Sequence, residues 1–196
     1  NIHNLCIDMN GIIHSCAQEI YEYGNFKKNR FITKKNKLTL KNQLRLFNKI
    51  GDTIENIRNT IQPTKRIILC IDGVAGCAKM AQQRQRRFKS SLEYDEKEFN
   101  SNCISAGTKF MNYLSKYIDW YIRFMISTND YWKDLEVVFS SEKVPGEGEH
   151  KIINYIRKLG KESESFCIHG LDADLIMLGM SINNNDMYIY RENYYR

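Results

Sequence analysis

Short apolar runs alternate with longer amphipathic segments along this 196-residue chain, and this alternation limits the possible folds more than any other feature. The runs NLCID, RIILCID, LEVVFSS and SFCIHG are almost continuously apolar, which is typical of strands buried on both faces, and a fifth run, MYIY, lies near the end. Helix-like periodicity is clearest over residues 39–61, 105–126 and 146–159. Together they predict an α/β fold with a mostly parallel central sheet and helices on both faces.

The length of the chain and its 42% hydrophobic content are sufficient for one domain with a substantial core. Two stretches interrupt the alternation, a lysine-rich one at 24–38 and a polar, acidic one at 91–102, and we expect both to be mobile loops. The chain begins at Asn1 rather than at methionine and ends in RENYYR without a terminating pattern. We therefore expect residues 1–196 to be a single domain that is truncated at both ends.

Composition and motifs exclude several classes of protein. No apolar stretch approaches the roughly 20 residues of a membrane helix. The six cysteines lack the spacing of a zinc ribbon or redox motif, and those in apolar runs are typical of reduced core thiols in the cytoplasm or nucleus. A net charge of +6 permits a polyanionic partner but is weak evidence alone. The chain has no Walker loop, nucleophile elbow or dinucleotide fingerprint.

Acidic side chains follow four of the five expected strands. Ligands of open parallel sheets bind at the carboxyl ends of the strands, so these side chains should meet at one edge. Helix capping would explain a single acid at such a position, but it does not explain acids after four separate strands. The six acids are Asp8, Asp72, Glu147, Glu149, Asp172 and Asp174.

Four of these acids occur as pairs, in which a small residue separates two carboxylates just before an apolar helix. Inside a regular helix, residues two apart point roughly 200° away from each other. Glu147 and Glu149 therefore converge only if the backbone is still extended at the helix entrance, a conformation that Gly146 and Gly148 should permit. The DAD sequence at 172–174 repeats this pattern with alanine in the middle.

A cluster of six carboxylates needs a cation, because without one the charges repel and several groups take up protons. An all-oxygen ligand set suits Mg²⁺ or Mn²⁺. Two such ions, about 3.5 to 4 Å apart, are the usual means of catalysing in-line hydrolysis of a phosphodiester. We therefore expect the six acids to bind two divalent ions and to form a catalytic centre.

A basic segment, AGCAKMAQQRQRRFKSS, directly follows the second acidic strand end. On a helix, a lysine, a glutamine and one or two arginines would share one face at spacings of four, seven and eight. The plain alternative is a solvated basic surface on an ordinary packed helix. The segment has only a weak apolar stripe, however, and so has little with which to pack as such a helix. Arginine matches phosphate oxygens in pairs, so we expect a phosphate site here. Its residues would be Lys79, Gln83, Arg86 and Arg87.

Five motifs are specific enough to indicate a family. They are LCIDMNGIIHSC, CIDGVAGCAKMAQQRQRRFKSS, FNSNCISAGTKFM, VPGEGEHKIINYIR and GLDADLIMLG. In this order, from residue 4 to residue 179, they resemble the N-terminal catalytic region of the 5′→3′ exoribonucleases of the Xrn type. The resemblance implies a PIN/flap-endonuclease-like nuclease fold and a requirement for Mg²⁺ or Mn²⁺. It also implies stepwise hydrolysis of single-stranded RNA with a 5′ monophosphate to nucleoside 5′-monophosphates.

The resemblance also implies a role for each candidate residue. The six acids would be catalytic and metal-binding residues, and the basic face would hold the 5′ phosphate. His14, which from its position alone is either structural or stacks on a base, would stack on the 5′ nucleobases. We expect a monomer that acts in RNA degradation in the cytoplasm or nucleus, without a membrane.

Two alternatives use the same fold. One is a structure-specific 5′ DNA nuclease of the flap-endonuclease type, because the residues themselves do not distinguish RNA from DNA. The other is a catalytically impaired module that binds RNA or another partner. Digestion of matched RNA and DNA substrates separates these hypotheses.

Overall fold

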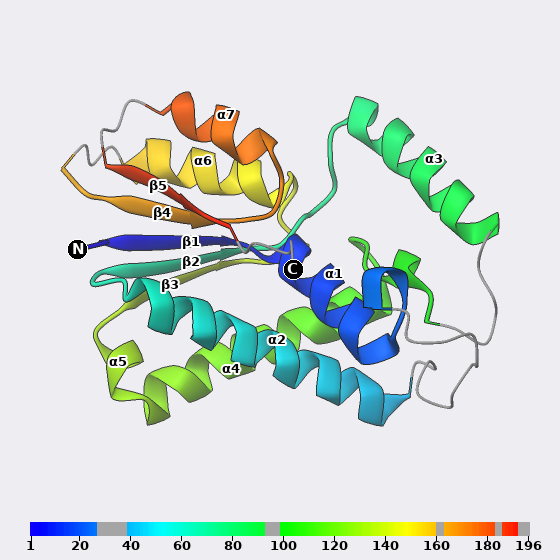
Figure 1. The fold of residues 1–196 in the computed structure, drawn as a ribbon, viewed down its shortest axis with the longest axis horizontal. Coiled ribbons are helices and arrows are strands. Elements are labelled where there is room, and N and C mark those ends of the chain that lie inside the picture. Colours follow the sequence, from blue (N-terminus) through cyan, green and yellow to red (C-terminus); the bar gives the residue numbers. More distant parts are fainter. Residues whose placement is uncertain (27–38, 93–98, 160–162, 183–185, 192–196) are drawn as a thin grey trace.

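The computed structural model describes residues 1–26, 39–92, 99–159, 163–182 and 186–191. At its centre is a five-stranded sheet in which all paired strands are parallel, in the order β3-β2-β1-β4-β5 (Figure 1). The predicted α/β class with a parallel sheet is therefore confirmed. The strands are β1 (Asn4–Asp8), β2 (Arg66–Cys70), β3 (Glu136–Ser140), β4 (Phe166–His169) and β5 (Met187–Tyr190).

The three central strands, β1, β2 and β4, are buried along their whole length. Their apolar runs are continuous because helices cover both faces of the sheet. Side chains alternate between the two faces, so that Leu5 and Ile7 enter one hydrophobic core and Cys6 enters the other. The edge strands β3 and β5 are less buried.

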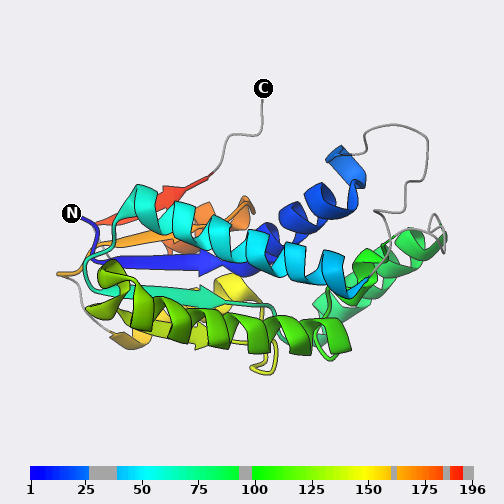
Figure 2. The ribbon, with the colours of Figure 1, turned by 90° about the horizontal axis from the view of Figure 1, so that it is seen from below.

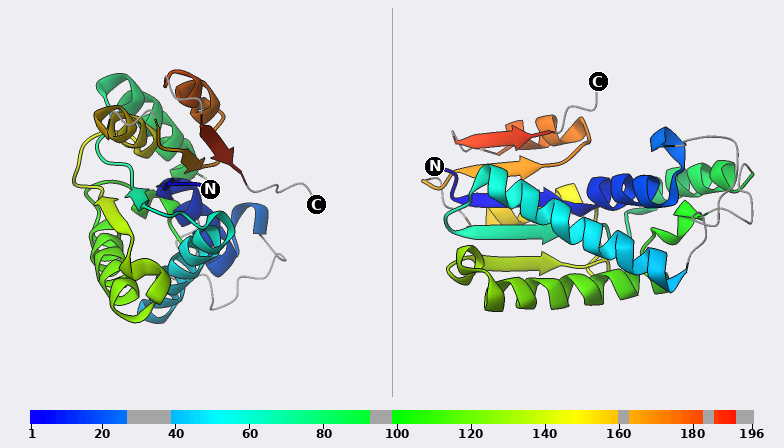
Figure 3. Two further views of the ribbon diagram at one scale, coloured as in Figure 1. Left: turned by 90° about the vertical axis from the view of Figure 1, so that its left-hand side faces the viewer. Right: turned by 60° about the horizontal axis from the view of Figure 1, so that its bottom comes forward.

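Helices cover both faces of the sheet, as predicted (Figures 1 and 3). The larger core lies beneath α1, α2 and α4, with the short α5 at the end of α4, and Figure 2 shows α2 and α4 crossing that face. The smaller core lies beneath α6 and α7. The bounds are α1 (Met9–Tyr21), α2 (Leu40–Ile61), α4 (Lys109–Thr128), α5 (Asp130–Lys133), α6 (Gly148–Leu159) and α7 (Asp174–Met180).

Capping residues determine where two of the predicted helices begin. The helix expected at 39–61 starts one residue later, because the side chain of Thr39 accepts a hydrogen bond from its first turn. The helix expected at 105–126 starts only at Lys109, because Thr108 is its N-cap. Periodicity located both helices, whereas hydrogen bonding at their ends decided their first residues.

Helix α3 (Cys77–Leu92) extends beyond the carboxyl edge of the sheet, away from the helices that cover its faces (Figure 1). Most of its described side chains are exposed, and only those of Lys79 and Gln83 are partly buried. This agrees with the weak apolar stripe of its sequence. The helix presents its basic residues beside the strand ends rather than packing on the core.

The segments expected to be mobile loops, 24–38 and 91–102, lie mostly outside the described residues, and their mobility stays a prediction. Within the second segment, Phe99 is buried and stacks on Tyr21 of α1, with 3.9 Å between ring centroids.

Among the described helices, none combines the length and the apolar character that a membrane crossing requires. Two short 3₁₀ turns are Gly24–Phe26 and Ser101–Cys103.

Candidate metal centre and phosphate-binding face

A cavity of about 1470 Å³ opens at the carboxyl edge of the sheet, and residues from α1, α3 and the start of α6 line it. Five of the six predicted acids are among its lining residues. The sixth, Asp174, is exposed in the first turn of α7 and is not part of the lining, although its charge acts on Glu149. The five are Asp8, Asp72, Glu147, Glu149 and Asp172.

Hydrogen bonds hold the first two acids in place. Asp8 ends β1 and caps α1, where its Oδ1 accepts a hydrogen bond from the backbone N–H of Asn10 (3.3 Å). Asp72 accepts hydrogen bonds from the side-chain amide of Asn10 (2.5 Å) and from the backbone N–H of Gly148 (2.5 Å). Its own N–H donates to Oδ1 of Asn10 (3.2 Å). Sequence reasoning missed Asn10, whose only signal is an amide two residues after an acidic strand end.

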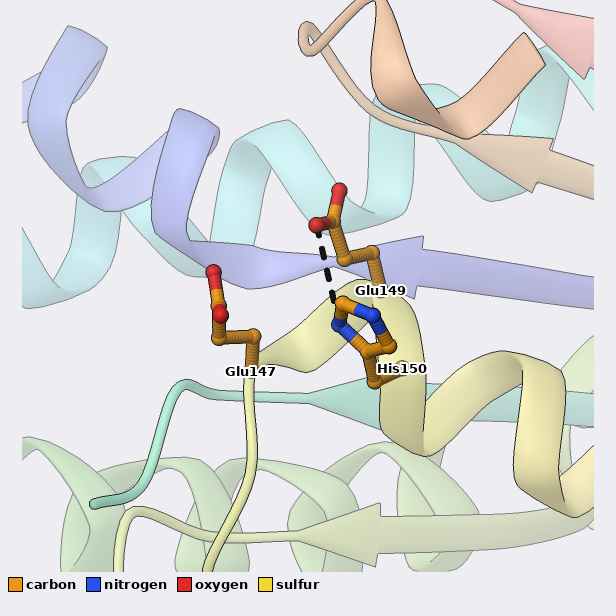
Figure 4. A group of neighbouring side chains, drawn as sticks. All are labelled: Glu147, Glu149 and His150. Atoms are coloured by element: carbon orange, nitrogen blue, oxygen red, sulfur yellow. Dashed lines mark ion pairs between the residues drawn. The ribbon is translucent and has the colours of Figure 1, made fainter. Parts of the chain in front are cut away.

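The second pair of acids converges at the start of α6. Glu147 precedes the helix, Glu149 lies in its first turn, and ligand atoms of these two residues and His150 lie within 4.8 Å of one another. Figure 4 shows the two carboxylates extending in the same direction, with the ring of His150 beside Glu149. The Nδ1 atom of His150 is 3.7 Å from Oε1 of Glu149. His150 was not among the residues selected from the sequence.

The two glycines of this motif have different reasons to be glycine. Gly146 has a φ of +107°, which lies in the left-handed region that favours glycine and not in the extended region that was expected. Gly148, by contrast, is the first residue of α6, so an extended backbone is not its reason. A Cβ atom there would lie 2.6 Å from Oδ1 of Asp8, so the expectation was wrong for Gly148. Its missing side chain allows the helix start to approach the strand ends.

Burial and mutual repulsion make this cluster costly to ionise. Burial, followed by the charge of Asp72, raises the pKa of Asp8 to about 7. Burial also raises the pKa of Asp72, with a further contribution from Glu147. The pKa of Glu149 is raised by burial and by the charges of Asp172 and other acids of the cluster. Most of these repulsions join acids from different strand ends, so the acids form one electrostatic unit.

A divalent cation fits this arrangement. Oε2 of Glu149 is buried and has no hydrogen-bond partner among the described residues, although buried polar atoms are usually paired. The surrounding atoms that could bind a metal are carboxylate oxygens, the ligands that hard cations such as Mg²⁺ prefer. A bound cation would pair the free oxygen and offset the repulsion between the acids. The acidic cluster therefore has the composition of a divalent-metal site.

The basic face of α3 lines the same cavity as the acids. Nζ of Lys79 forms an ion pair with Oε2 of Glu147 at 2.7 Å, which joins the basic face directly to the acidic cluster. Nη2 of Arg87 donates a hydrogen bond to Oε1 of Gln83 at 3.5 Å. The lysine, glutamine and arginine side chains of α3 that line the cavity are Lys79, Gln83, Arg86 and Arg87, together with Arg84, which sequence reasoning did not select.

His14 lies on α1 and also lines the cavity, beside Gln18. Its side chain is partly buried, and this burial lowers the pKa of its imidazole. The ring is therefore held closer to its neutral form than an exposed histidine would be. A neutral ring at the wall of a charged cavity is suited to contact with the flat face of a base.

Comparison with known proteins identifies the family. The chain matches the family model described as XRN 5'-3' exonuclease N-terminus over residues 1–98 and 90–193. It is 38% identical to 5'-3' exoribonuclease 1 of Saccharomyces cerevisiae, over 96% of this chain and 13% of that protein. It is 35% identical to 5'-3' exoribonuclease 2 of Gallus gallus (97% and 22%) and to 5'-3' exoribonuclease 1 of Homo sapiens (96% and 12%).

The chain spans less than a quarter of the length of each of these relatives. The family match nevertheless covers almost all of its residues, from strand β1 to strand β5. The resemblance seen in the five sequence motifs is confirmed, and the parallel sheet agrees with the PIN-like nuclease fold of this family. The chain belongs to the XRN 5'-3' exonuclease N-terminus family.

Proposed function

We propose that this chain is the nuclease domain of a 5′→3′ exoribonuclease, which hydrolyses 5′-monophosphorylated single-stranded RNA stepwise to nucleoside 5′-monophosphates. The observation that carries the proposal is that one cavity contains both an acidic cluster and a basic face, joined by the ion pair between Lys79 and Glu147. The names of the relatives support RNA as substrate and the 5′→3′ direction.

The acidic cluster would hold Mg²⁺ or Mn²⁺, in our proposal two ions. When bound, such ions would polarise the scissile phosphate and supply a nucleophile at neutral pH. The five acids that line the cavity are the proposed primary ligands, and Asp174, outside the lining, would contribute at the rim. Asn10 would keep Asp72 oriented through its two hydrogen bonds.

The basic face would bind the terminal phosphate of the RNA. Arg86 and Arg87 are exposed in the cavity, where guanidinium groups can match phosphate oxygens. Lys79 forms an ion pair with Glu147 here. We propose that the metal ions would bind Glu147 and the terminal phosphate would bind Lys79, so that this ion pair separates. His14 would stack on the first bases. A pocket that closes around one phosphate would exclude a cap or a triphosphate.

The test is digestion of matched RNA and DNA strands that carry a 5′ monophosphate, with 5′-hydroxyl RNA as a further substrate. We expect the phosphorylated RNA to shorten from its 5′ end in Mg²⁺, with release of nucleoside 5′-monophosphates, and no digestion in EDTA. Faster digestion of DNA would favour the flap-endonuclease alternative. RNA binding in Mg²⁺ without shortening would favour the interaction module. The presence of all six acids argues against that alternative.

Two further parts of the proposal concern the working protein rather than its site. We infer that it acts as a monomer and that it degrades RNA in the cytoplasm or nucleus. Sedimentation of the purified chain would test the first inference. Imaging of the tagged protein in its own cells would test the second.

A further inference from the structure

Lys151 is a buried lysine whose ammonium group joins three elements behind the acidic cluster. It lies on α6, two residues after Glu149, and only 9% of the residue is exposed. Its Nζ donates hydrogen bonds to the carbonyl oxygens of Ile71 (2.7 Å) and Ser141 (2.9 Å). Ile71 immediately precedes Asp72, and Ser141 immediately follows β3. Lys151 does not line the cavity, so it is placed to act through other residues.

A second buried charge lies in the same region. Glu142 follows Ser141, is 5% exposed, and accepts a hydrogen bond from the hydroxyl of Ser115 on α4. Burial lowers the pKa of the Lys151 ammonium, and the negative charges of Asp72 and Glu142 act to raise it. The segment between β3 and α6, which carries Glu147, is thus tied to α4 on one side and to the end of β2 on the other.

Backbone hydrogen bonds reinforce the same junction. The N–H of Gly73 donates to the carbonyl of Gly146 (2.8 Å), and the N–H of Gly146 donates to the carbonyl of Val74 (2.9 Å). These bonds join the chain after Asp72 to the chain before Glu147. The ammonium of Lys151 is the side-chain group that completes the junction from the helix side.

We propose that Lys151 is a positioning residue that sets the spacing between Asp72 and the Glu147/Glu149 pair, with Glu142 as its buried counter-charge. The role rests on the proposed function, because the groups that it positions are the proposed metal ligands. Metal sites depend on such outer groups, whose loss typically weakens binding about 10- to 100-fold. Lys151 contacts the backbone on which one ligand is carried, and it shares a helix turn with another.

The experiment measures Mn²⁺ affinity by calorimetry, so it does not depend on RNA digestion. Lys151→Met keeps the apolar stem and removes the ammonium, and Lys158→Met is the matched control, since Lys158 is exposed in the last turn of the same helix. We expect Lys151→Met to bind Mn²⁺ about 10- to 100-fold more weakly. Lys151→Arg should restore part of the affinity, because it can still donate to two carbonyls. The control should match the wild type.

Glu142→Gln provides a second measurement that remains informative if Lys151→Met does not fold. It keeps the hydrogen bond to Ser115 and removes only the charge, and we expect a several-fold loss of Mn²⁺ affinity. Unchanged affinity in folded Lys151→Met, or in Glu142→Gln where Lys151→Met does not fold, would overturn the inference. A wild-type chain that binds Mn²⁺ but leaves RNA intact would contradict only the proposed function. Absence of Mn²⁺ binding by the wild type would overturn both.

Discussion

Asp8 is both a helix cap and a member of the acidic cluster. As the N-cap of α1 it needs only an oxygen that accepts a hydrogen bond, whereas as a ligand it needs a negative charge. Its burial and the charge of Asp72 raise its pKa to about 7, so ionisation of Asp8 opposes folding of the metal-free chain near neutral pH. The two roles can therefore be separated by one substitution.

We predict that Asp8→Asn raises the stability of the metal-free chain and lowers its RNase activity. Asparagine caps a helix about as well as aspartate, so α1 should be kept while one charge leaves the cluster. At about pH 8 in EDTA, the free energy of unfolding should rise by on the order of 2 kcal/mol. Activity should fall by at least about 100-fold, as for loss of other strong electrostatic groups. Denaturant titration and RNA digestion measure the two effects, and retained activity would contradict the assignment of Asp8.

At the scale of single elements, the position of the site depends on how closely the start of α6 approaches β1 and β2. The N–H of Gly148 donates a hydrogen bond to Asp72. Oδ1 of Asp8 and the carbonyl oxygen of Cys70 lie close to the position that a Cβ atom at Gly148 would occupy. A side chain at Gly148 would therefore meet both a proposed ligand and backbone. The glycine allows two proposed ligands from different elements to approach each other.

We predict that Gly148→Ala displaces the start of α6. Its Cβ atom would lie 2.6 Å from Oδ1 of Asp8 and 3.2 Å from the carbonyl oxygen of Cys70. The cost should be about 1–3 kcal/mol of unfolding free energy, with an activity loss of about 10²-fold. Gly76→Ala is the control, because a Cβ atom at Gly76 meets nothing within 4 Å. Thermal unfolding and RNA digestion compare the variants, and equal behaviour of the two would refute this explanation.

The other element whose contribution can be isolated is α3. We predict that Arg87→Ala reduces the preference for 5′-phosphate over 5′-hydroxyl RNA by about 10- to 100-fold, the effect of losing a charged hydrogen bond of about 1.5–3 kcal/mol. Lys89→Ala removes a charge from the same exposed helix outside the cavity lining and should leave the preference unchanged. Rates on the two RNAs give the ratio directly. An unaltered ratio in Arg87→Ala would indicate that the basic face is only a solvated surface.

For the whole molecule, the acidic cluster predicts how stability depends on pH. A carboxyl group whose pKa is raised on folding binds more protons in the native state than in the unfolded state. Asp8, Asp72 and Glu149 all have raised pKa values, so their contribution to the stability of the metal-free chain should fall as pH rises from about 4 to 7. His14 acts in the opposite direction, since burial lowers its pKa.

We predict that Mg²⁺ or Mn²⁺ stabilises the chain more strongly as pH rises, because ligands must lose their protons before they bind the ion. Melting temperatures measured between about pH 5 and pH 8, with EDTA or with the metal, should diverge toward high pH. The Asp8→Asn variant should show a flatter dependence in EDTA, which separates the contribution of Asp8 from that of His14. Metal stabilisation that is constant across this range would argue against the cluster as the binding site.

Local sequence patterns were sufficient to predict the class of fold and most of the candidate site. Continuous apolar runs and helical periodicity are local patterns, and such runs occur where a parallel sheet is covered on both faces. The order of strands and helices could therefore be predicted. The topology of a parallel sheet then brings the strand ends together, which is why five of the six selected acids line one cavity with the selected face of α3.

Contacts between segments that are distant in sequence could not be predicted, because they depend on tertiary packing. Asn10 holds Asp72, Gly148 must be small because Asp8 lies beside it, and Lys151 donates to carbonyls at the ends of two strands. None of these relations has a periodic signal, because each depends on the distance at which α6 and α1 pack against the sheet. Packing also placed Asp174 outside the cavity lining, although its sequence pattern matches that of the other pair.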